Sequence, residues 1–346
     1  MHRRSRPPRR TGAARREAGT DPGDIMSRRP SRWHGLLPVA KLAGPTSHDI
    51  VDMARKALRE RRIGHTGTLD PMAEGLLILC VGTATRLQQY LLAWDKVYEG
   101  RIRLGRATTT YDREGEPQEP SGPVPDLGDG ALRELEAAFT GEIDQVPPPF
   151  SAKKVDGKKL YELAREGQEV HVEPKRVHVQ SLRLELVEPE VLRFEVQTSS
   201  GFYVRSLAHD IGLRLGCGGH LEHLLRRRIG PYSTDVAIPQ ERLQAAADPA
   251  EIIEGDAWIP LADVELPYPE LNLNPAAEDR FQNGGEVILL RQGVSELGQG
   301  DTVVLRGREN RLVGIGSVAN VLARGRTVVV QPKMVLPAVT SGKVGR

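Results

Sequence analysis

One aspartate, Asp70, stands where the sequence favours a rigid and exposed carboxylate. It lies in the turn-rich stretch 64–71 (GHTGTLDP), just ahead of an apolar run. Pro71 disfavours helical backbone at the residue before it, and an aspartate is ionised near neutral pH. Such a carboxylate can act as a nucleophile or a base. From the Asp-Pro pair alone, however, an Asx-turn that only shapes the loop is the favoured interpretation.

Three other side chains near turns could assist a carboxylate. His65 lies in the same loop, where its ring could make a structural hydrogen bond or stack on a nucleic-acid base. Tyr203 and Arg205 lie where a strand is expected to end and a helix to begin. A guanidinium at such a junction can reach a carboxylate or a phosphate with two hydrogen bonds. A solvated arginine at a helix start is the alternative.

Basic clusters occur at residues 153–159, which hold four lysines, and at the three arginines 226–228. Either cluster alone is usual for a solvated surface, but the two together favour a polyanionic partner. Cys217 and His220 form a lone Cys-x-x-His without the second pair that zinc needs, so we expect no metal site. We expect Cys217 to be buried and His220 to begin a helix. The sequence has no phosphate-binding loop, dinucleotide fingerprint or nucleophile elbow, and no cofactor is indicated.

Length and composition limit the class of protein. The chain has 346 residues, 39% of them hydrophobic, which is enough for a real core and suggests two domains. Gly and Pro are frequent and aromatic residues make up only 4%, so many turns and short elements are expected. No apolar run is long enough to cross a membrane, and the first residues lack the apolar core of a signal peptide. With only two cysteines, a cytoplasmic location is expected.

The N-terminal residues 1–33 differ from the rest of the chain in charge. They hold 10 arginines against three acidic residues, a net charge of +7, whereas the remainder has a net charge of −5. This segment has no apolar periodicity. Two interpretations are open: a disordered basic arm that adds nonspecific affinity for nucleic acid, or an over-extended start with true initiation at Met26.

The elements that must position these groups follow from local patterns. Thr46 or Ser47 should cap a helix whose apolar residues recur every three or four positions up to Leu58. Further expected helices are at 83–92, 132–139, 161–166, 206–215 and 221–227, and expected strands are at 75–82, 97–104 and within 177–196. Residues 113–130 are rich in Pro, Gly and acidic residues and should form a surface insertion.

Residues 255–340 contain short Val-rich runs separated by glycines, the pattern of a small β-barrel. The expected organisation is therefore a tail at 1–33, a main domain at 34–250 with an insertion at 113–170, and a barrel at 255–340.

Five stretches resemble the TruB family of pseudouridine synthases. The most specific is GHTGTLDPMAEGLLILCVGTATR at residues 64–86. The others occur in the family order at residues 41–50, 95–98, 145–167 and 199–232. The resemblance implies an α+β fold with a mixed, mostly antiparallel sheet. It also implies that the C-terminal barrel is an RNA-binding domain of the PUA type.

The function that the resemblance implies is isomerisation of uridine to pseudouridine at position 55, in the T loop of tRNA. The resemblance also implies that the reaction needs no cofactor. It implies a monomer that needs no protein partner and that also holds the acceptor arm of the tRNA. Asp70 would be the catalytic aspartate, Arg205 its ion-pair partner, and Tyr98 the ring that stacks on the target base. The residues implied to contact the substrate are Lys41, His65, Asp112, Tyr203 and Leu224.

The sequence departs from the family pattern at Leu42, Thr109 and Phe150, none of which is an implied catalytic residue. Two alternatives are also weighed. One is a tRNA-binding or RNA-folding protein without catalysis. The other is the guide-RNA-dependent branch of the same superfamily, which acts in a multiprotein particle.

Overall fold

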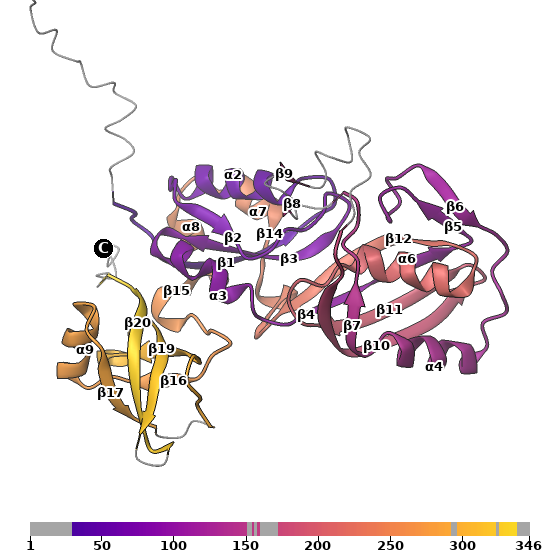
Figure 1. Cartoon of the computed structure of the whole chain (residues 1–346). Helices are drawn as coiled ribbons and strands as arrows, with labels where there is room; N and C mark the ends of the chain where they lie inside the picture. Colours follow the sequence, from indigo (N-terminus) through magenta and orange to yellow (C-terminus); the bar gives the residue numbers. More distant parts are fainter. Residues whose placement is uncertain are drawn as a thin grey trace, which may run out of the picture.

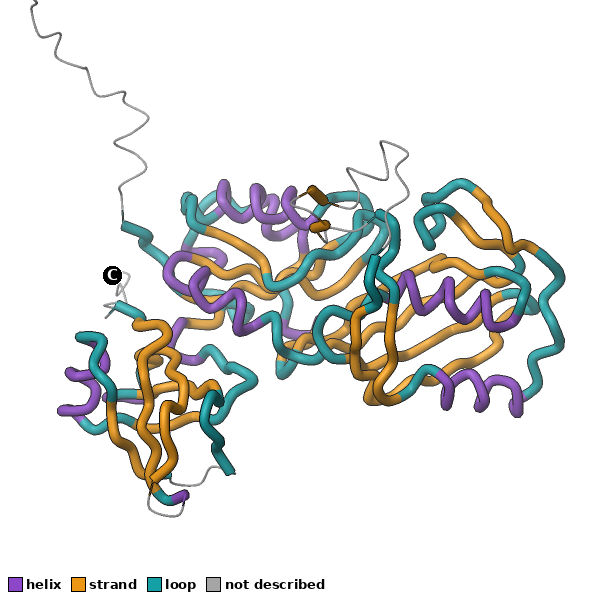
Figure 2. The backbone as a smooth tube through the Cα atoms, in the orientation of Figure 1, coloured by secondary structure: helices purple, strands orange, loops and turns teal. Residues whose placement is uncertain are grey.

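The structure is a computed structural model that describes residues 30–150, 154–155, 158–159, 172–291, 296–322 and 325–337. Three of the predictions above lie outside the described residues: the tail up to residue 29, the side chains of the lysine cluster, and the helix at 161–166. Figure 1 gives the arrangement of the elements, and Figure 2 shows how strands dominate it.

A large sheet forms the framework of the N-terminal part of the described chain. Its strands follow the order β14-β1-β3-β12-β4-β11-β10-β7. Three short strands pair with members of this series: β2 with β3, β13 with β12 and β15 with β1. The pairs β1–β14 and β3–β12 are parallel, whereas the other pairs of this sheet are antiparallel. The expected α+β class with a mixed, mostly antiparallel sheet is therefore confirmed. The bounds are β1 Gly35–Lys41, β2 Ile63–His65, β3 Glu74–Val81, β4 Lys96–Leu104, β7 Gly141–Gln145, β10 Lys175–Glu188, β11 Val191–Thr198, β12 Gly219–Ile229, β13 Tyr232–Ser233, β14 Ile238–Pro239 and β15 Ile259–Pro260.

Helices cover one face of this sheet. Helix α2 (Ser47–Ala57) begins at Thr46, whose side chain accepts from the Asp49 amide while the Asp49 carboxylate accepts from the Thr46 amide. This capping box is the helix start that the sequence predicts. The main core lies between the helices and the strands, and it contains apolar residues of α2, β3 and β4. The other helices are α4 Asp129–Ala138, α6 Val204–Leu215, α7 Gln240–Ala245 and α8 Ala250–Ile253.

Strand β3 separates two apolar cores. Leu77, Leu79 and Val81 belong to the main core, and the alternate residues Leu76, Ile78 and Cys80 belong to a second core on the opposite face. This explains the unbroken apolar run at 75–82, because a strand covered on both faces has no polar side. The predicted helix at 83–92 is instead a 3-10 turn, η1 (Gly82–Leu87), followed by the one-turn helix α3 (Gln88–Leu91).

The predicted helix at 221–227 is wrong, because these residues form the central strand β12 between β3 and β4. Two irregularities in register, between Leu221 and His223 and between Arg226 and Arg228, interrupt its alternation. The buried side chains of this stretch are therefore spaced unevenly, which hides the strand period of two; they are Leu221, Leu224 and Arg226. His220 accordingly lies in a strand and does not begin a helix, whereas Cys217 is buried as expected.

The C-terminal part forms a five-stranded sheet in the order β16-β18-β19-β20-β17. It contributes Val304, Ile315 and Met334 to the second core, so it packs on the back of β3 (Figure 1). Polar contacts add to this junction: Arg86 donates to the carbonyl of Val335 at 2.7 Å. The bounds are β16 Glu270–Asn272, α9 Pro275–Gln282, β17 Val287–Leu290, β18 Thr302–Arg306, β19 Leu312–Leu322 and β20 Thr327–Val335.

Candidate active site

The Asp70 loop, residues 66–73, joins β2 to β3 and is held by hydrogen bonds to α2 and β3. The Leu69 amide donates to Ser47 Oγ at 2.8 Å, and Ser47 Oγ donates to the Leu69 carbonyl at 3.0 Å. Since Ser47 is the first residue of α2, the helix start and the loop hold each other. The Thr66 amide donates to the carbonyl of Ile78 at 3.0 Å, which ties the loop to β3.

Lys41 lies at the end of β1 beneath this loop and is only 1% exposed. Its Nζ donates to the carbonyls of Asp70, Pro71 and Ala73 at 3.2, 3.2 and 2.6 Å, and to that of Leu42 at 3.1 Å. Burial lowers the pKa of Lys41 to about 8, although the Asp70 and Glu74 carboxylates act in the opposite direction. In this arrangement the lysine holds the loop backbone and does not face solvent.

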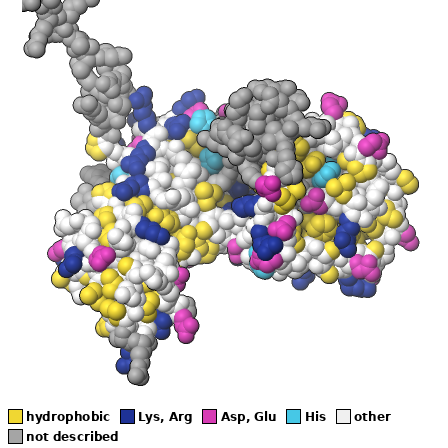
Figure 3. Space-filling view, in the orientation of Figure 1, with side chains coloured by type: hydrophobic (Ala, Val, Ile, Leu, Met, Phe, Trp, Pro, Cys, Tyr) yellow, Lys and Arg dark blue, Asp and Glu magenta, His cyan; other side chains and the backbone are white. Residues whose placement is uncertain are grey.

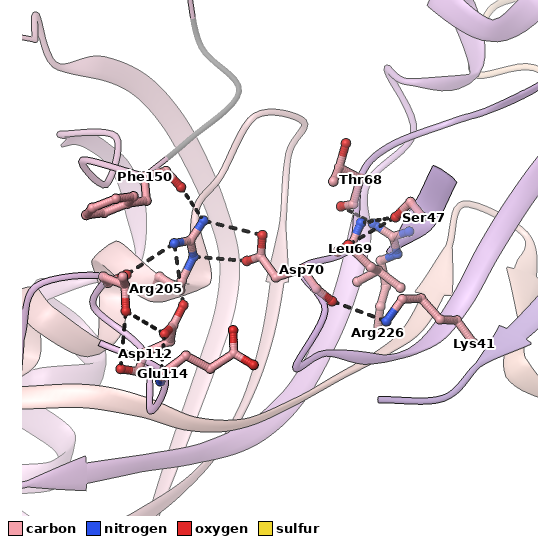
Figure 4. A network of polar contacts seen from close by, with 11 residues as sticks. Lys41, Ser47, Thr68, Leu69, Asp70, Asp112, Glu114, Phe150, Arg205 and Arg226 are labelled. Atoms are coloured by element: carbon pink, nitrogen blue, oxygen red, sulfur yellow. Dashed lines mark hydrogen bonds and ion pairs between the residues drawn. The ribbon is translucent and has the colours of Figure 1, made fainter. Parts of the chain in front are cut away.

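Arg205 holds the Asp70 carboxylate in a fork (Figure 4). Its Nε lies 2.9 Å from Asp70 Oδ2, and its Nη2 donates to Oδ1 at 3.3 Å. The arginine projects from the first turn of α6 and its side chain is 9% exposed, whereas that of Asp70 is 33% exposed. The pairing that the family resemblance implies is thus present, and the carboxylate keeps a face open to solvent.

The far side of the Arg205 guanidinium is also occupied. Its Nη1 lies 3.5 Å from Asp112 Oδ2 and donates to the Thr110 carbonyl at 3.1 Å, while Nη2 donates to the Phe150 carbonyl at 3.0 Å. Asp112 is buried and accepts from the Thr110 hydroxyl at 2.6 Å. Buried between two carboxylates and two carbonyls, Arg205 has one orientation available. The Thr110 and Phe150 carbonyls were not predicted from sequence, because backbone acceptors leave no mark on residue type.

A turn between β5 (Arg106–Thr108) and β6 (Pro117–Ser121) carries Asp112. Tyr111 takes a left-handed backbone conformation with φ of 64°, and its ring stacks on His209 with centroids 3.7 Å apart. His209 lies one helical turn after Arg205 on α6. One face of α6 therefore holds both the Asp112 carboxylate and the ring of the preceding residue.

Tyr98 and Leu224 lie on the neighbouring strands β4 and β12, and both are buried in the main core. The Tyr98 hydroxyl lies against the Arg226 guanidinium. Tyr203 is the residue that precedes α6, and its backbone is paired in both directions with the Gln145 side chain, at 2.7 and 2.9 Å. Tyr98 and Leu224 thus lie on paired strands of the main sheet, and Tyr203 lies two residues before Arg205.

His65 lies at the end of β2, where its Nδ1 accepts from the Gly67 amide at 3.4 Å. Burial and the nearby Arg226 lower the pKa of His65, so its ring is neutral near pH 7. His65 therefore immediately precedes the Asp70 loop and lies five residues before Asp70.

The predicted basic patch at 226–228 is exposed only in part. Arg226 is 2% exposed. Arg227 is exposed but forms an ion pair with Glu99 at 3.2 Å, and Arg228 is exposed. On the face seen in Figure 3, lysine and arginine side chains alternate with acidic ones. A surface hollow of about 880 Å³ near the outer end of β4 is lined by Arg101, Arg103 and Glu222, and not by Asp70.

Within the described residues, no group of three or more His, Cys, Asp or Glu side chains is arranged to bind a metal ion. In the same part of the chain, no helix is long and apolar enough to cross a membrane. Cys217 Sγ donates to the Gly218 carbonyl at 3.3 Å, and His220 Nδ1 lies 2.9 Å from the Arg106 carbonyl. Both candidate ligands thus have partners in the protein backbone.

Comparison with known proteins assigns this arrangement to a family. A model described as TruB family pseudouridylate synthase (N terminal domain) matches residues 55–204, and one described as tRNA pseudouridylate synthase B C-terminal domain matches residues 205–257. A tRNA pseudouridine synthase B of Aromatoleum aromaticum is 44% identical over 285 residues, which cover 82% of this chain and 88% of that protein. The chain belongs to the TruB family. It is a tRNA pseudouridine synthase, an isomerase that converts uridine to pseudouridine.

A second curated relative agrees with the TruB family, and solved structures share the fold. A tRNA pseudouridine synthase B of Solibacter usitatus is 40% identical over 250 residues, 72% of this chain and 84% of that protein. Two solved structures share the fold with TM-scores of 0.67. They are "Structure of H/ACA RNP bound to a substrate RNA containing 2'-deoxyuridine", at 22% identity over 89% of this chain and 86% of that one, and "Crystal Structure of a Cbf5-Nop10-Gar1 Complex", at 23% over 89% and 88%.

Proposed function

We propose that this synthase modifies uridine 55 in the T loop of tRNA and that Asp70 is its catalytic carboxylate. The observation that carries the proposal is the fork of Arg205 on a partly exposed Asp70, in the loop with the most specific family signature. A guanidinium fork fixes the direction of the carboxylate and favours its ionised form. The ion pair thus supplies an oriented anion that keeps one face open to solvent.

The reaction requires three events in one enclosed place. The glycosidic bond breaks, the uracil turns, and its C5 joins the ribose C1′. Asp70 serves either by attacking C1′ or by taking a ribose proton to form a glycal. Both routes need an anion held within about 3–3.5 Å of the sugar, which is what a rigid loop provides. The chemistry is an isomerisation, so it needs no redox or group-transfer cofactor.

The target base must leave the stack before it can react. Extruding a nucleotide costs a few kcal/mol, and stacking on an aromatic ring returns about 1–3 kcal/mol. We assign the ring that receives the base to Tyr98 and the apolar wall beside it to Leu224. Tyr98 is also the candidate for removing the proton from C5. His65, with its neutral ring, would fill the gap that the flipped bases leave, while Asp112 and Tyr203 would contact the substrate.

The rest of the chain is assigned to holding the tRNA. We propose that residues 34–250, with the insertion 113–170, bind the T stem-loop. The five-stranded C-terminal region, 255–340, would act as a PUA-like domain on the acceptor arm. Lys41 would support the substrate indirectly, since its Nζ is bound to loop carbonyls. We further propose that the chain acts as a monomer in the cytoplasm, without a guide RNA.

The central experiment replaces Asp70 by Asn, which preserves shape and removes the charge. The purified variant is incubated with unmodified tRNA, and pseudouridine is mapped by chemical labelling. We expect no product with Asp70→Asn and normal binding of the T stem-loop. Undiminished product would refute the assignment of Asp70, and modification outside the T loop would refute the proposed target.

The two alternatives are separated by simple controls. A protein that only binds or folds tRNA would bind equally well before and after Asp70→Asn and would give no product in either form. A guide-RNA-dependent enzyme would leave an isolated T stem-loop unmodified. We expect the unsubstituted chain alone to modify the isolated stem-loop.

A further inference from the structure

Arg226 is a buried cation that neither the sequence patterns nor the proposed chemistry accounts for. It is among the largest fully buried side chains in the described part of the chain. No carboxylate in that part forms an ion pair with it, and burial lowers the pKa of its guanidinium. A buried charge is costly unless its donors are satisfied, so the position of those acceptors indicates what the charge does.

The acceptors of Arg226 belong to the Asp70 loop and the strand that follows it. Nη2 donates to the Gly67 carbonyl at 3.1 Å, Nη1 to that of Thr68 at 3.4 Å, and Nε to that of Leu76 at 2.8 Å. Two of these carbonyls lie in the first half of the loop, and the third lies in β3, three residues beyond its end. Figure 4 shows Arg226 and Lys41 on one side of Asp70, and Arg205 on the other.

The sheet register places Arg226 between Tyr98 and the strand that follows the Asp70 loop. In β12 it pairs with Tyr98 of β4 on one side and with Gly75 of β3 on the other. The Tyr98 hydroxyl lies against the same guanidinium that holds Gly67 and Thr68. One rigid side chain therefore contacts both the loop that carries Asp70 and the ring assigned to the base.

We propose that Arg226 is a positioning residue that fixes the Asp70 loop and the Tyr98 ring relative to each other. The inference rests on the proposed function, because it assigns a purpose to the Asp70–Tyr98 geometry. Arg226 itself does not touch the substrate. The planar guanidinium can contact several backbone carbonyls and the Tyr98 hydroxyl at the same time. A lysine ammonium at the end of a flexible side chain cannot do so.

The test compares Arg226→Gln and Arg226→Lys with Arg227→Gln as a matched control. Arg227 is the next residue along β12, and its exposed side chain pairs with Glu99. Each variant is assayed for the single-turnover rate and for the Kd of an unmodified T stem-loop. A displacement of about 1 Å can cost about 100-fold in rate. We expect a loss of about 100-fold for Gln and about tenfold for Lys, with Kd within about threefold in both.

A folded Arg226→Gln that keeps the full rate would overturn the proposal, as would a loss confined to Kd. Arg227→Gln should keep both the rate and the Kd of the unsubstituted chain; an equal loss there would also count against it. Retained activity in Asp70→Asn would instead sink the proposed function, so the two failures are distinguishable.

Hydrogen exchange in the unsubstituted protein tests the proposal even if the Arg226 variants do not fold. The hydrogen-bonded amides of Thr66 and Leu69 in the Asp70 loop should exchange about as slowly as those of β3. Exchange as fast as in an exposed loop would show that the loop is not held, and the proposal would fail.

Discussion

At the scale of single residues, the site depends on how buried cations are used. Arg205 meets carboxylates, whereas Lys41 and Arg226 meet backbone carbonyls of the Asp70 loop. Carbonyls carry no formal charge, so hydrogen bonds compensate much of the burial of these two cations, and the Asp70 carboxylate, which is not hydrogen-bonded to either, adds a longer-range attraction. This makes Lys41 sensitive to pH in a way that an ion-paired lysine would not be.

The first prediction concerns activity above about pH 8. Burial lowers the pKa of Lys41 to about 8, against the opposing effect of Asp70 and Glu74. A neutral amine has fewer N–H groups than an ammonium, so the carbonyls of the loop lose donors as pH rises. We expect the single-turnover rate to fall through this range. Lys96, whose pKa burial also lowers to about 8, is the control: the fall should persist in Lys96→Met.

Stability should change in the opposite direction. The folded pKa of Lys41 is about 8 and the ordinary value is 10.5, so between these values the unfolded chain holds the proton that the folded chain has released. Its contribution to the free energy of unfolding therefore rises with pH across that window. Denaturant titrations at several pH values measure this. Parallel falls in rate and stability would contradict the assignment to Lys41.

At the scale of elements, the junction of β3 and β12 decides where Asp70, Tyr98 and Arg226 lie. The parallel pairing of these strands involves Gly75, whose φ is +104°. A Cβ there would lie 2.3 Å from the Arg226 carbonyl oxygen. Only glycine permits this close approach of β12 to β3, and the approach allows the Arg226 side chain to reach the Asp70 loop.

The second prediction follows from this contact. Gly75→Ala should reduce the free energy of unfolding by about 3 kcal/mol, from backbone strain and the clash together. Gly44→Ala is a matched control, since Gly44 also has a positive φ, of +112°, but no atom within 4 Å of the added Cβ. It should cost about 1 kcal/mol from strain alone. Equal losses in denaturant titrations would show that the close approach to β12 does not matter.

At the scale of the whole molecule, the C-terminal sheet completes a core of the catalytic half. Leu76, Ile78 and Cys80 on the back of β3 share that core with Val304 and Met334. The strand that directly follows the Asp70 loop is thus supported from both faces. The C-terminal region therefore stabilises the site as well as having its proposed role in tRNA binding.

The third prediction uses the two cysteines as reporters of these two cores. Both are buried, Cys80 in the core shared with the C-terminal sheet and Cys217 in the main core. In a chain that ends at Asp263, we expect a thiol reagent to label Cys80 rapidly and Cys217 slowly. Both should stay unreactive in the full chain. Equal protection of Cys80 in the shortened chain would mean that the C-terminal sheet does not seal the back of β3.

The sequence by itself determined the loop around Asp70, the capped helix α2, the apolar strand β3 and the family, because each depends on residues that are neighbours in the chain. It also indicated Tyr98 and Arg205 through that family. Only the tertiary structure decided that 221–227 is a strand and that Arg226 is buried. Both depend on pairing with β3 and β4, more than a hundred residues away in the chain, and on register shifts that hide the strand period. The local residue pattern does not reveal strand partners that are distant in the chain. Arg226 therefore resembled part of an exposed basic patch with its two neighbouring arginines.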